Sequence, residues 1–313
     1  MSFSQDTKNE LSRIMPDRKC CMRAEIAAFI RVCGNLRLMG GGKFEIAVGT
    51  ENPAIARHFN KLVREYFNVD TSVEIAKGSS LTKGRLYTTT IGPEDLSEQI
   101  LRETGILMVR EGMNYISDGI YDELLRKKCC RKAYIRGLFL GAGTMTNPEK
   151  EYHYEIALTS KKLADDVRRL FNTFTDITPK YFQRKAEHVV YFKDSQQILD
   201  LLAIMGASTQ YFTFEDVRFN KELRNNANRL ANCDQANIDK SLAAADRQIR
   251  AIEEVGIGNL PPKLAEIAAI RLEHPDLSIK ELGEYLDPPL TKAGVNGRLA
   301  RIEKLAEKAR AER

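Results

Sequence analysis

Two stretches of the chain carry the same spacing of large apolar residues, with gaps of four, three, one and three positions. The first stretch is Ile55, Phe59, Leu62, Val63 and Tyr66, and the second is Leu163, Val167, Leu170, Phe171 and Phe174. These gaps follow one face of an α-helix, so each stretch predicts a helix with a buried apolar stripe. The recurrence of the pattern predicts two structurally similar halves.

Around each of these helices the pattern changes to short segments typical of strands, separated by turn residues. In the first half we expect strands at 35–39, 43–48, 72–76 and 85–91, and a closing helix over 93–103. In the second half we expect strands at 144–146, 152–158, 180–183 and 188–192, and a closing helix over 195–205. Each half therefore reads α-β-β-α-β-β-α, with a four-stranded antiparallel sheet covered on one face by helices.

The helix that opens each half is predicted from a duplicated segment. Residues 20–34 read CCMRAEIAAFIRVCG and residues 129–143 read CCRKAYIRGLFLGAG, with five identities at fixed positions. Both copies contain small residues, such as Ala28 and Gly137, that let two helix backbones approach closely. We therefore expect the two helices to pack on each other at a pseudo-two-fold axis.

The composition changes past residue 206, where the repeat ends. Residues 218–240 contain six asparagines and five basic residues, and residues 243–255 read as a helix. The asparagine-rich stretch is compatible with a linker helix that lies along DNA and with a solvated connector.

The last part of the chain predicts three helices. A helix over 262–273 begins with proline, and Ser278 to Glu281 form a capping box for a short helix that runs to about residue 286. Thr291 can cap a third helix, whose predicted buried face is Val295, Leu299, Ile302 and Leu305. Helix, short helix, turn and helix is the arrangement of a helix-turn-helix unit, in which the last helix enters the major groove.

The predicted fold class is α+β, with a duplicated αββαββα domain followed by an all-α helix-turn-helix domain. We place the first half at 1–115, the second half at 116–212, a helical linker at 213–258 and the helix-turn-helix domain at 259–313.

Composition removes several classes of protein. With 43% hydrophobic and 29% charged residues, the chain of 313 residues is typical of folded domains. It has no apolar run near the roughly 20 residues that span a bilayer, and its start lacks the pattern of a signal peptide. We expect a cytoplasmic, nucleoid-associated protein with no membrane contact.

Six cysteines are too few for a disulfide scaffold. We expect free thiols, no metal and no cofactor. The alternative is that Cys20-Cys21 and Cys129-Cys130 meet near the pseudo-axis and bind a metal.

The net charge of +5 is weak evidence for a polyanionic partner, but the distribution of charge says more. Six lysines and arginines and no acid fall between residues 126 and 136, and residues 292–313 hold seven basic residues against three acidic ones. Arginine pairs with guanine edges and asparagine with adenine, whereas lysine and hydroxyl groups more often reach phosphates. In the helix-turn-helix unit the candidate DNA-binding residues are Ser278, Lys280, Thr291, Lys292, Asn296, Arg298, Arg301 and Lys304. The candidate contacts to the DNA backbone elsewhere are Lys127, Lys128, Arg131, Lys132, Arg218, Arg224 and Arg229.

The segment 134–143 resembles the LAGLIDADG motif of homing endonucleases, whose fold is the same duplicated arrangement. In that family an acid just before the final glycine binds a divalent metal that assists phosphodiester cleavage. This position holds Cys33 in one copy and Ala142 in the other, and neither is a normal ligand for a hard cation. We therefore expect no catalytic residues. An endonuclease that uses Glu45 and Glu155 instead is the alternative.

Nearly the whole chain resembles the WhiA proteins of Gram-positive bacteria. The resemblance is carried by Ser2-Phe3-Ser4, Lys8-Asn9-Glu10-Leu11, the segment 129–137, and the segments 281–284 and 294–299. It implies a non-catalytic, sequence-specific transcriptional regulator that binds double-stranded DNA at promoter regions. It also implies roles in cell division, chromosome segregation and, in spore-formers, sporulation.

Three points qualify the resemblance. Family members often have histidine where this chain has Gly297. The family also allows a second transcription regulator as partner, and the sequence leaves the oligomeric state open. In a further alternative, the duplicated domain is a protein-interaction platform and only the C-terminal domain binds DNA.

Overall fold

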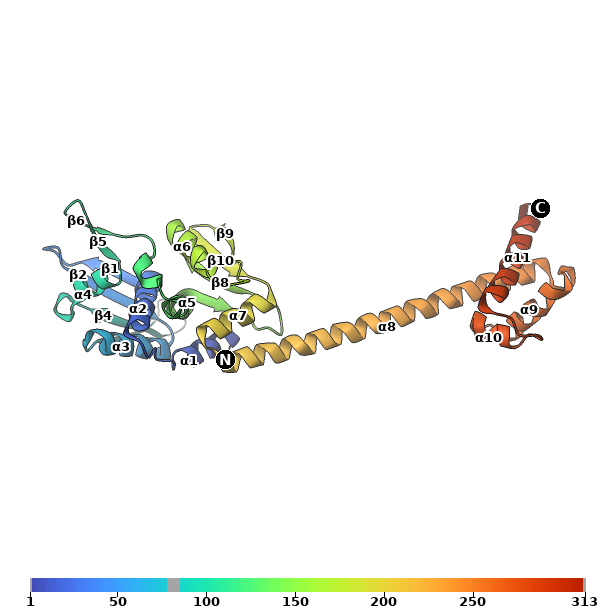
Figure 1. Cartoon of the computed structure of the whole chain (residues 1–313), viewed down its shortest axis with the longest axis horizontal. Coiled ribbons are helices and arrows are strands. Elements are labelled where there is room, and N and C mark those ends of the chain that lie inside the picture. The colour runs from blue at the N-terminus through green and yellow to red at the C-terminus, as the bar shows by residue number, and fades with distance from the viewer. Residues whose placement is uncertain (1, 78–84, 312–313) are drawn as a thin grey trace. The chain divides into compact units, whose positions relative to one another are not determined.

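The computed structural model describes residues 2–77 and 85–311 and divides into two compact units, Met1–Asn220 and Lys221–Arg313 (Figure 1). The first unit holds two copies of one α+β arrangement, and the second unit is helical. The predicted fold class is therefore confirmed.

The first half of the first unit contains one sheet and the helices that cover it. In order it comprises α2 (Lys19–Cys33), β1 (Gly34–Leu38), β2 (Phe44–Thr50), α3 (Pro53–Phe67), β3 (Ser72–Lys77), β4 (Arg85–Ile91), the 3-10 turn η1 (Pro93–Asp95) and α4 (Ser97–Glu103). The sheet has the antiparallel order β1-β2-β4-β3. The predicted helix over 93–103 is thus split in two, because Leu96 adopts a left-handed conformation between η1 and α4.

The second half repeats this order of elements. It comprises α5 (Lys128–Ala142), β7 (Gly143–Met145), β8 (Tyr154–Leu158), α6 (Lys161–Phe171), β9 (Lys180–Arg184), β10 (Glu187–Phe192) and α7 (Ser195–Met205). Its sheet order, β7-β8-β10-β9, is the same permutation as in the first half. The identical strand order confirms that the sequence repeat is a structural repeat.

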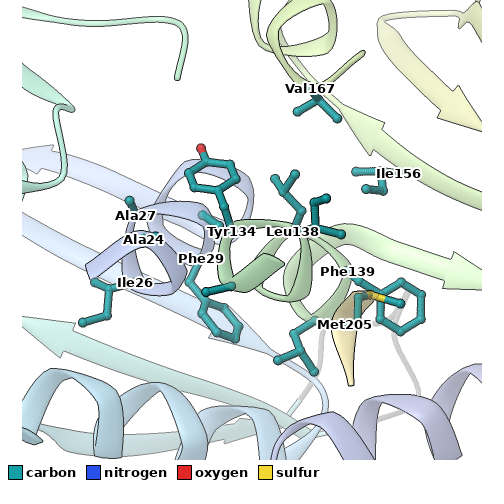
Figure 2. Close-up of a cluster of buried hydrophobic side chains, with 14 of the residues drawn as sticks. Ala24, Ile26, Ala27, Phe29, Tyr134, Leu138, Phe139, Ile156, Val167 and Met205 are labelled. Atoms are coloured by element: carbon teal, nitrogen blue, oxygen red, sulfur yellow. The ribbon is translucent and has the colours of Figure 1, made fainter. Parts of the chain in front are cut away.

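Helices α2 and α5 pack directly on each other between the two sheets (Figure 1). Figure 2 shows Ala24, Ala27 and Tyr134 at this junction, with Leu138 and Phe139 continuing the core toward the second sheet. Gly137 is required for the close approach, because a Cβ there would lie 2.8 Å from the Cβ of Ala28. The small residues of the duplicated segment are therefore a packing device.

Several short elements of the first unit have no counterpart among the predicted elements. Helix α1 (Phe3–Leu11) is capped by Ser2 and buries Phe3, Thr7 and Leu11, which lie on one helical face. A two-stranded hairpin, β5 (Leu107–Arg110) with β6 (Met113–Ile116), and the 3-10 turn η2 (Asp122–Leu125) connect the two halves.

Helix α8 (Ser208–Val255) runs through the asparagine-rich stretch and through the helix expected after it. Its first turn is fixed by Glu10 of α1, whose carboxylate accepts hydrogen bonds from the backbone amides of Thr209 and Gln210 at 2.7 and 3.0 Å. Its last turns bury Ala251 and Ile252 in the core of the second unit. The stretch is therefore helical, and its residues 222–243 are exposed to solvent.

The second unit packs the end of α8 with three further helices and a short turn. These are η3 (Ile257–Asn259), α9 (Pro262–Glu273), α10 (Ile279–Glu284) and α11 (Lys292–Ala311). Val295, Leu299 and Ile302 are buried as predicted, but Leu305 is 36% exposed and Ala306 takes its place in the core. The predicted burial of Leu305 was wrong because it lies on the flank of α11 toward the start of α9. None of the described helices is long and apolar enough to cross a membrane.

Candidate nucleic-acid interface

Helix α11 presents a stripe of small side chains on the side opposite its buried face. Ala293, Gly297 and Ala300 recur at helical spacing and are exposed or partly exposed, and Lys304 continues the stripe. Gly297 has open space around the position of its missing side chain. A helix with small residues on its outer face can bring its backbone close to the base edges of a major groove.

Polar side chains flank this stripe on both sides. Asn296 lies on one edge and Arg301 on the other, about 140° apart around the helix at 3.6 residues per turn. Both side chains are exposed, as are Lys292 and Lys304. The geometry therefore places a base-reading amide and a guanidinium on opposite margins of one surface.

Arg298 does not belong to this surface. Its Nη1 donates to the backbone carbonyl of Lys263 at 3.1 Å and lies 3.4 Å from a carboxylate oxygen of Glu266, both on α9. Its side chain is 22% exposed. The expectation that Arg298 points outward was wrong, because it lies about 200° from Asn296 around α11, on the side that packs against α9.

Ser278 and Thr291 act as helix caps at the entrances of α10 and α11. The Ser278 hydroxyl accepts from the Glu281 amide, and the Ser278 amide donates to the Glu281 carboxylate at 2.8 Å. Hydrogen bonds to the Glu281 carboxylate from the Ser278 side chain and from the Ser278 backbone amide lower the pKa of Glu281. The Thr291 hydroxyl accepts from the Gly294 amide at 3.3 Å. The Thr291 hydroxyl keeps its own proton to donate to a phosphate, and Lys280 is exposed beside Ser278.

The turn between α10 and α11 depends on a glycine that lies inside α10 instead of in the turn. A Cβ on Gly283 would lie 2.2 Å from the carbonyl oxygen of Leu290, and the Leu290 amide donates to the Gly283 carbonyl at 3.0 Å. The missing side chain therefore lets the turn cross α10 closely.

The acidic side chains that the structure describes on α11 lie in its C-terminal half. Glu303 and Glu307 face the end of α8, where they share a pocket with Arg247, Arg250 and Arg310. On the other flank, Arg301, Lys304 and Lys308 line a groove of about 720 Å³ whose opposite wall includes Lys263 and Pro262. The sequence reasoning missed Lys263 and Lys308, although Lys308 follows Lys304 by one helical turn. The α9-facing flank of α11 and the N-terminal part of its outer side are therefore electropositive.

The faces of the two sheets that point away from the helices carry paired charges. Arg37 lies 3.1 Å from Glu45 on the first sheet, and Arg184 lies 3.3 Å from Glu155 on the second. Both glutamates are the residues that the endonuclease alternative would use. Because each is engaged with an arginine, these faces offer less free positive charge than the sequence suggested.

The basic residues proposed as backbone contacts are scattered. Lys127, Lys128 and Lys132 are exposed at the start of α5, whereas the Arg131 guanidinium donates to the Leu125 carbonyl at 2.7 Å. Since α5 has 15 residues, its start lies about 20 Å from Ala142 at its end. This basic cluster and the degenerate acid positions therefore lie at opposite ends of the helix.

The other three backbone candidates lie on α8. Arg218 donates to the side-chain oxygen of Gln196 at 2.6 Å, while Arg224 and Arg229 are exposed.

The position of the missing acid in the first half is occupied by a neutral, sheltered thiol. The Cys33 thiol donates to the Phe29 carbonyl at 3.1 Å, and burial raises its pKa to about 12. Lys8 of α1 lies close by, 5.7 Å from the centre of the Phe139 ring, and desolvation lowers the pKa of its ammonium to about 8. A lysine in this place opposes binding of a divalent cation.

Three family models cover most of the chain. They describe a WhiA N-terminal LAGLIDADG-like domain at residues 19–107, a WhiA LAGLIDADG-like domain at 131–224 and a WhiA C-terminal HTH domain at 227–306. The chain belongs to the WhiA family. The family resemblance read from the sequence is thereby confirmed.

Full-length relatives agree with this membership. The chain is 42% identical over 99% of both lengths to the probable cell division protein WhiA of Alkaliphilus metalliredigens. It is 45% identical over 98% of both lengths to the protein of the same name in Alkaliphilus oremlandii. Among solved structures, full-length DUF199/WhiA from Thermatoga maritima matches 98% of this chain and 99% of its own, with a TM-score of 0.61 and 26% identity.

Proposed function

We propose that this WhiA-family chain is a non-catalytic, sequence-specific transcriptional regulator that binds double-stranded DNA at promoter regions. The observation that carries the proposal is the outer surface of α11, where small residues are flanked by Asn296 and Arg301. The acids Glu303 and Glu307 lie further along the helix, where they line a pocket with Arg247 and Arg250. Asn296 and Arg301 read base edges from the two margins of this surface. Lys280, Lys292 and Lys304 contact phosphates and set the register of the helix in the groove.

The duplicated domain serves this function without cleaving DNA. Cys33 and Ala142 stand where metal-binding acids are needed, and Lys8 adds a positive charge beside Cys33. Incubation of the full chain with supercoiled plasmid and Mg²⁺ or Mn²⁺ tests this directly. We expect the plasmid to stay supercoiled, and nicking that rises with protein concentration would establish a nuclease instead.

Family membership supports a proposal about the biological setting. We propose that the regulator acts at the nucleoid in cell division and chromosome segregation, and in sporulation where the organism forms spores. A second transcription regulator is a candidate partner. Mapping of the bound sites across the genome should find them upstream of division and segregation genes, and a random distribution would remove this assignment.

Sequence-specific binding is tested by using the full chain to select duplexes from a random pool. We expect the selected duplex to bind at least about 10³-fold more tightly than a shuffled duplex of equal composition at physiological salt. Equal affinity for the two duplexes would show that the chain binds DNA without reading its sequence.

The duplicated domain as a protein-interaction platform is a second candidate for the role of residues 1–220. It is favoured by the pairing of Arg37 with Glu45 and of Arg184 with Glu155, which lowers the free positive charge of the sheet faces. If the duplicated domain binds protein and does not contact DNA, Lys180→Glu with Arg184→Glu should leave the salt dependence of DNA binding unchanged. A decrease in the slope would show that the second sheet contacts the DNA backbone.

A further inference from the structure

Four cysteine sulfurs meet where the two halves of the first unit join. Cys20 and Cys21 lie in the first turn of α2, and Cys129 and Cys130 lie in the first turn of α5. All four Sγ atoms lie within 4.8 Å of one another. Hydrogen bonds connect the two cysteine pairs across the helix junction. The thiol of Cys21 is hydrogen-bonded to Cys129, and that of Cys130 to Cys20.

The shape of this cluster is close to that of a tetrahedral metal site. Zinc bound by four thiolates at about 2.3 Å places the sulfurs about 3.8 Å apart. No two of the four sulfurs exceed that separation by more than about 1 Å, so small changes of side-chain torsion can bring them to the tetrahedral spacing. Cys21 and Cys130 are buried while Cys20 and Cys129 are partly exposed, which leaves a route for the ion from solvent.

The N-termini of α2 and α5, which adjoin the cluster, carry residue types that are unfavourable there unless an anionic group lies between the two helices. Residues 18 and 127, the N-cap positions of α2 and α5, are Arg18 and Lys127, and neither makes a side-chain cap hydrogen bond. Basic residues are unfavourable at a helix N-terminus, where the macrodipole is positive. By contrast, α1, α3, α6 and α7 of the same unit are each capped by a serine, asparagine or aspartate side chain.

Basic residues stand next to the cysteines in the sequence of both halves. Lys19 and Lys128 follow the two N-cap residues, and Arg18 Nη1 lies 3.9 Å from the sulfur of Cys129. Two helix N-termini and these side chains are suited to balancing a group with net negative charge.

We propose that Cys20, Cys21, Cys129 and Cys130 bind one zinc ion, which links the two halves of the duplicated domain. Four thiols bind one Zn²⁺ and release four protons, and the resulting tetrathiolate carries a net charge of −2. Arg18, whose guanidinium lies at Cys129, and the two helix N-termini offset this charge. A site with four sulfur ligands and no open position is structural, and its all-sulfur donor set selects a soft, thiolate-preferring cation over Mg²⁺ or Mn²⁺.

This proposal replaces the expectation of free thiols and no metal at these positions. Adjacent cysteines on one helix are poor ligands alone, because they point about 100° apart around the axis. Two such pairs from facing helices enclose a common centre, and the fold supplies that arrangement. The site lies at the opposite ends of α2 and α5 from Cys33 and Ala142, so it is separate from the degenerate nuclease positions.

The experiment uses the full chain, purified under reducing conditions without added metal or chelator. Metal analysis should find about one zinc per chain. After removal of zinc, titration with Co²⁺ should give the visible d–d absorption and sulfur-to-metal charge-transfer bands of a tetrahedral cobalt thiolate, saturating at one equivalent. Zn²⁺ should then abolish these bands. A Co²⁺ titration without them, or four thiols that react freely with a thiol reagent in native protein, would overturn the proposal.

Variants separate the site from the other cysteines. Cys21→Ser with Cys129→Ser should reduce bound zinc to below about a tenth of an equivalent, since two ligands do not hold a structural ion. The matched control is Cys33→Ser with Cys233→Ser, which should keep the full equivalent. If the first variant does not fold, the wild-type cobalt titration still decides. Disulfides among the four cysteines in protein purified anaerobically would contradict zinc binding.

Discussion

Glu25 and Arg136 form a buried ion pair that joins the two halves of the duplicated domain. Nε of Arg136 lies 3.1 Å from both carboxylate oxygens of Glu25, and Nη2 lies 2.6 Å from Oε2. His58 of α3 adds a contact of 2.8 Å to the same carboxylate, and Arg136 also donates to the Met205 carbonyl at 3.3 Å. One carboxylate of α2 thus organises side chains from α3 and α5.

Removal of one partner should be costly because it leaves the other charge buried. We expect Arg136→Met to lower the free energy of unfolding by about 3–5 kcal/mol, as for other broken buried pairs. Urea denaturation monitored by circular dichroism measures this. Arg64→Met is the control, since Arg64 pairs with Asp70 at an exposed site and should cost less than about 1 kcal/mol. A loss below 1 kcal/mol for Arg136→Met would show that the pair is dispensable.

Glycine-to-alanine substitutions at two helical positions should change the free energy of unfolding in opposite directions. At Gly137 the new methyl group would lie 2.8 Å from the Ala28 Cβ and from the Glu25 carbonyl oxygen. We expect Gly137→Ala to destabilise by about 1–3 kcal/mol despite its better helix propensity. Gly297→Ala meets no atoms within 4 Å and should stabilise the second unit by about 0.5–1 kcal/mol. Thermal unfolding of the two variants would contradict the packing argument if both shifted in the same direction.

The amine of Lys8 should make stability depend on pH. Its pKa is lowered by desolvation from 10.5 to about 8, so the unfolded chain binds more protons than the folded chain between these values. Stability should therefore rise with pH across this window, and Lys8→Met should be more stable than the parent by about 3 kcal/mol at pH 7. The difference should shrink as the pH approaches 10.5. A difference that is constant from pH 7 to 10.5 would show that Lys8 is not desolvated.

Arg298 should affect stability more than sequence recognition. Its guanidinium is engaged with the Lys263 carbonyl and Glu266 on α9, so Arg298→Ala should cost about 1 kcal/mol of unfolding free energy. The ratio of affinities for selected and shuffled duplexes should change less than about threefold, because the side chain does not face the outer surface. Lys308→Ala is the control, with weaker binding to both duplexes and unchanged stability. If Arg298→Ala instead abolished the preference for the selected duplex, Arg298 would be a sequence-reading residue.

The sequence predicted the repeated elements well because each depends on local periodicity. The spacing of Ile55 to Tyr66 and of Leu163 to Phe174 required no tertiary information, and the capping box at Ser278 marked the start of α10. Helix α1 was missed although Phe3, Thr7 and Leu11 recur every four residues, because a single short stripe at a chain end is a weak signal.

Site residues depended on geometry that sequence patterns do not carry. Arg298 and Arg301 are both arginines on one basic helix, and only the packing of α9 separates their roles. The repeat offered a meeting of the two cysteine pairs near the pseudo-axis only as an alternative, because their convergence depends on how α2 and α5 cross. Pairing of Glu45 with Arg37 likewise follows from strand register.

The central claim is that the outer surface of α11 reads DNA sequence, and one set of binding curves tests it. The full chain and its Asn296→Ala, Arg301→Ala and Lys304→Ala variants are titrated with the selected duplex and a shuffled duplex at several salt concentrations. We predict that Asn296→Ala and Arg301→Ala each lose about 1–3 kcal/mol of affinity for the selected duplex only. Lys304→Ala should weaken both duplexes alike and reduce the salt slope by about 1. If both Asn296→Ala and Arg301→Ala kept the parent's ratio of affinities for the selected and shuffled duplexes, the outer surface of α11 would not be the part that reads sequence.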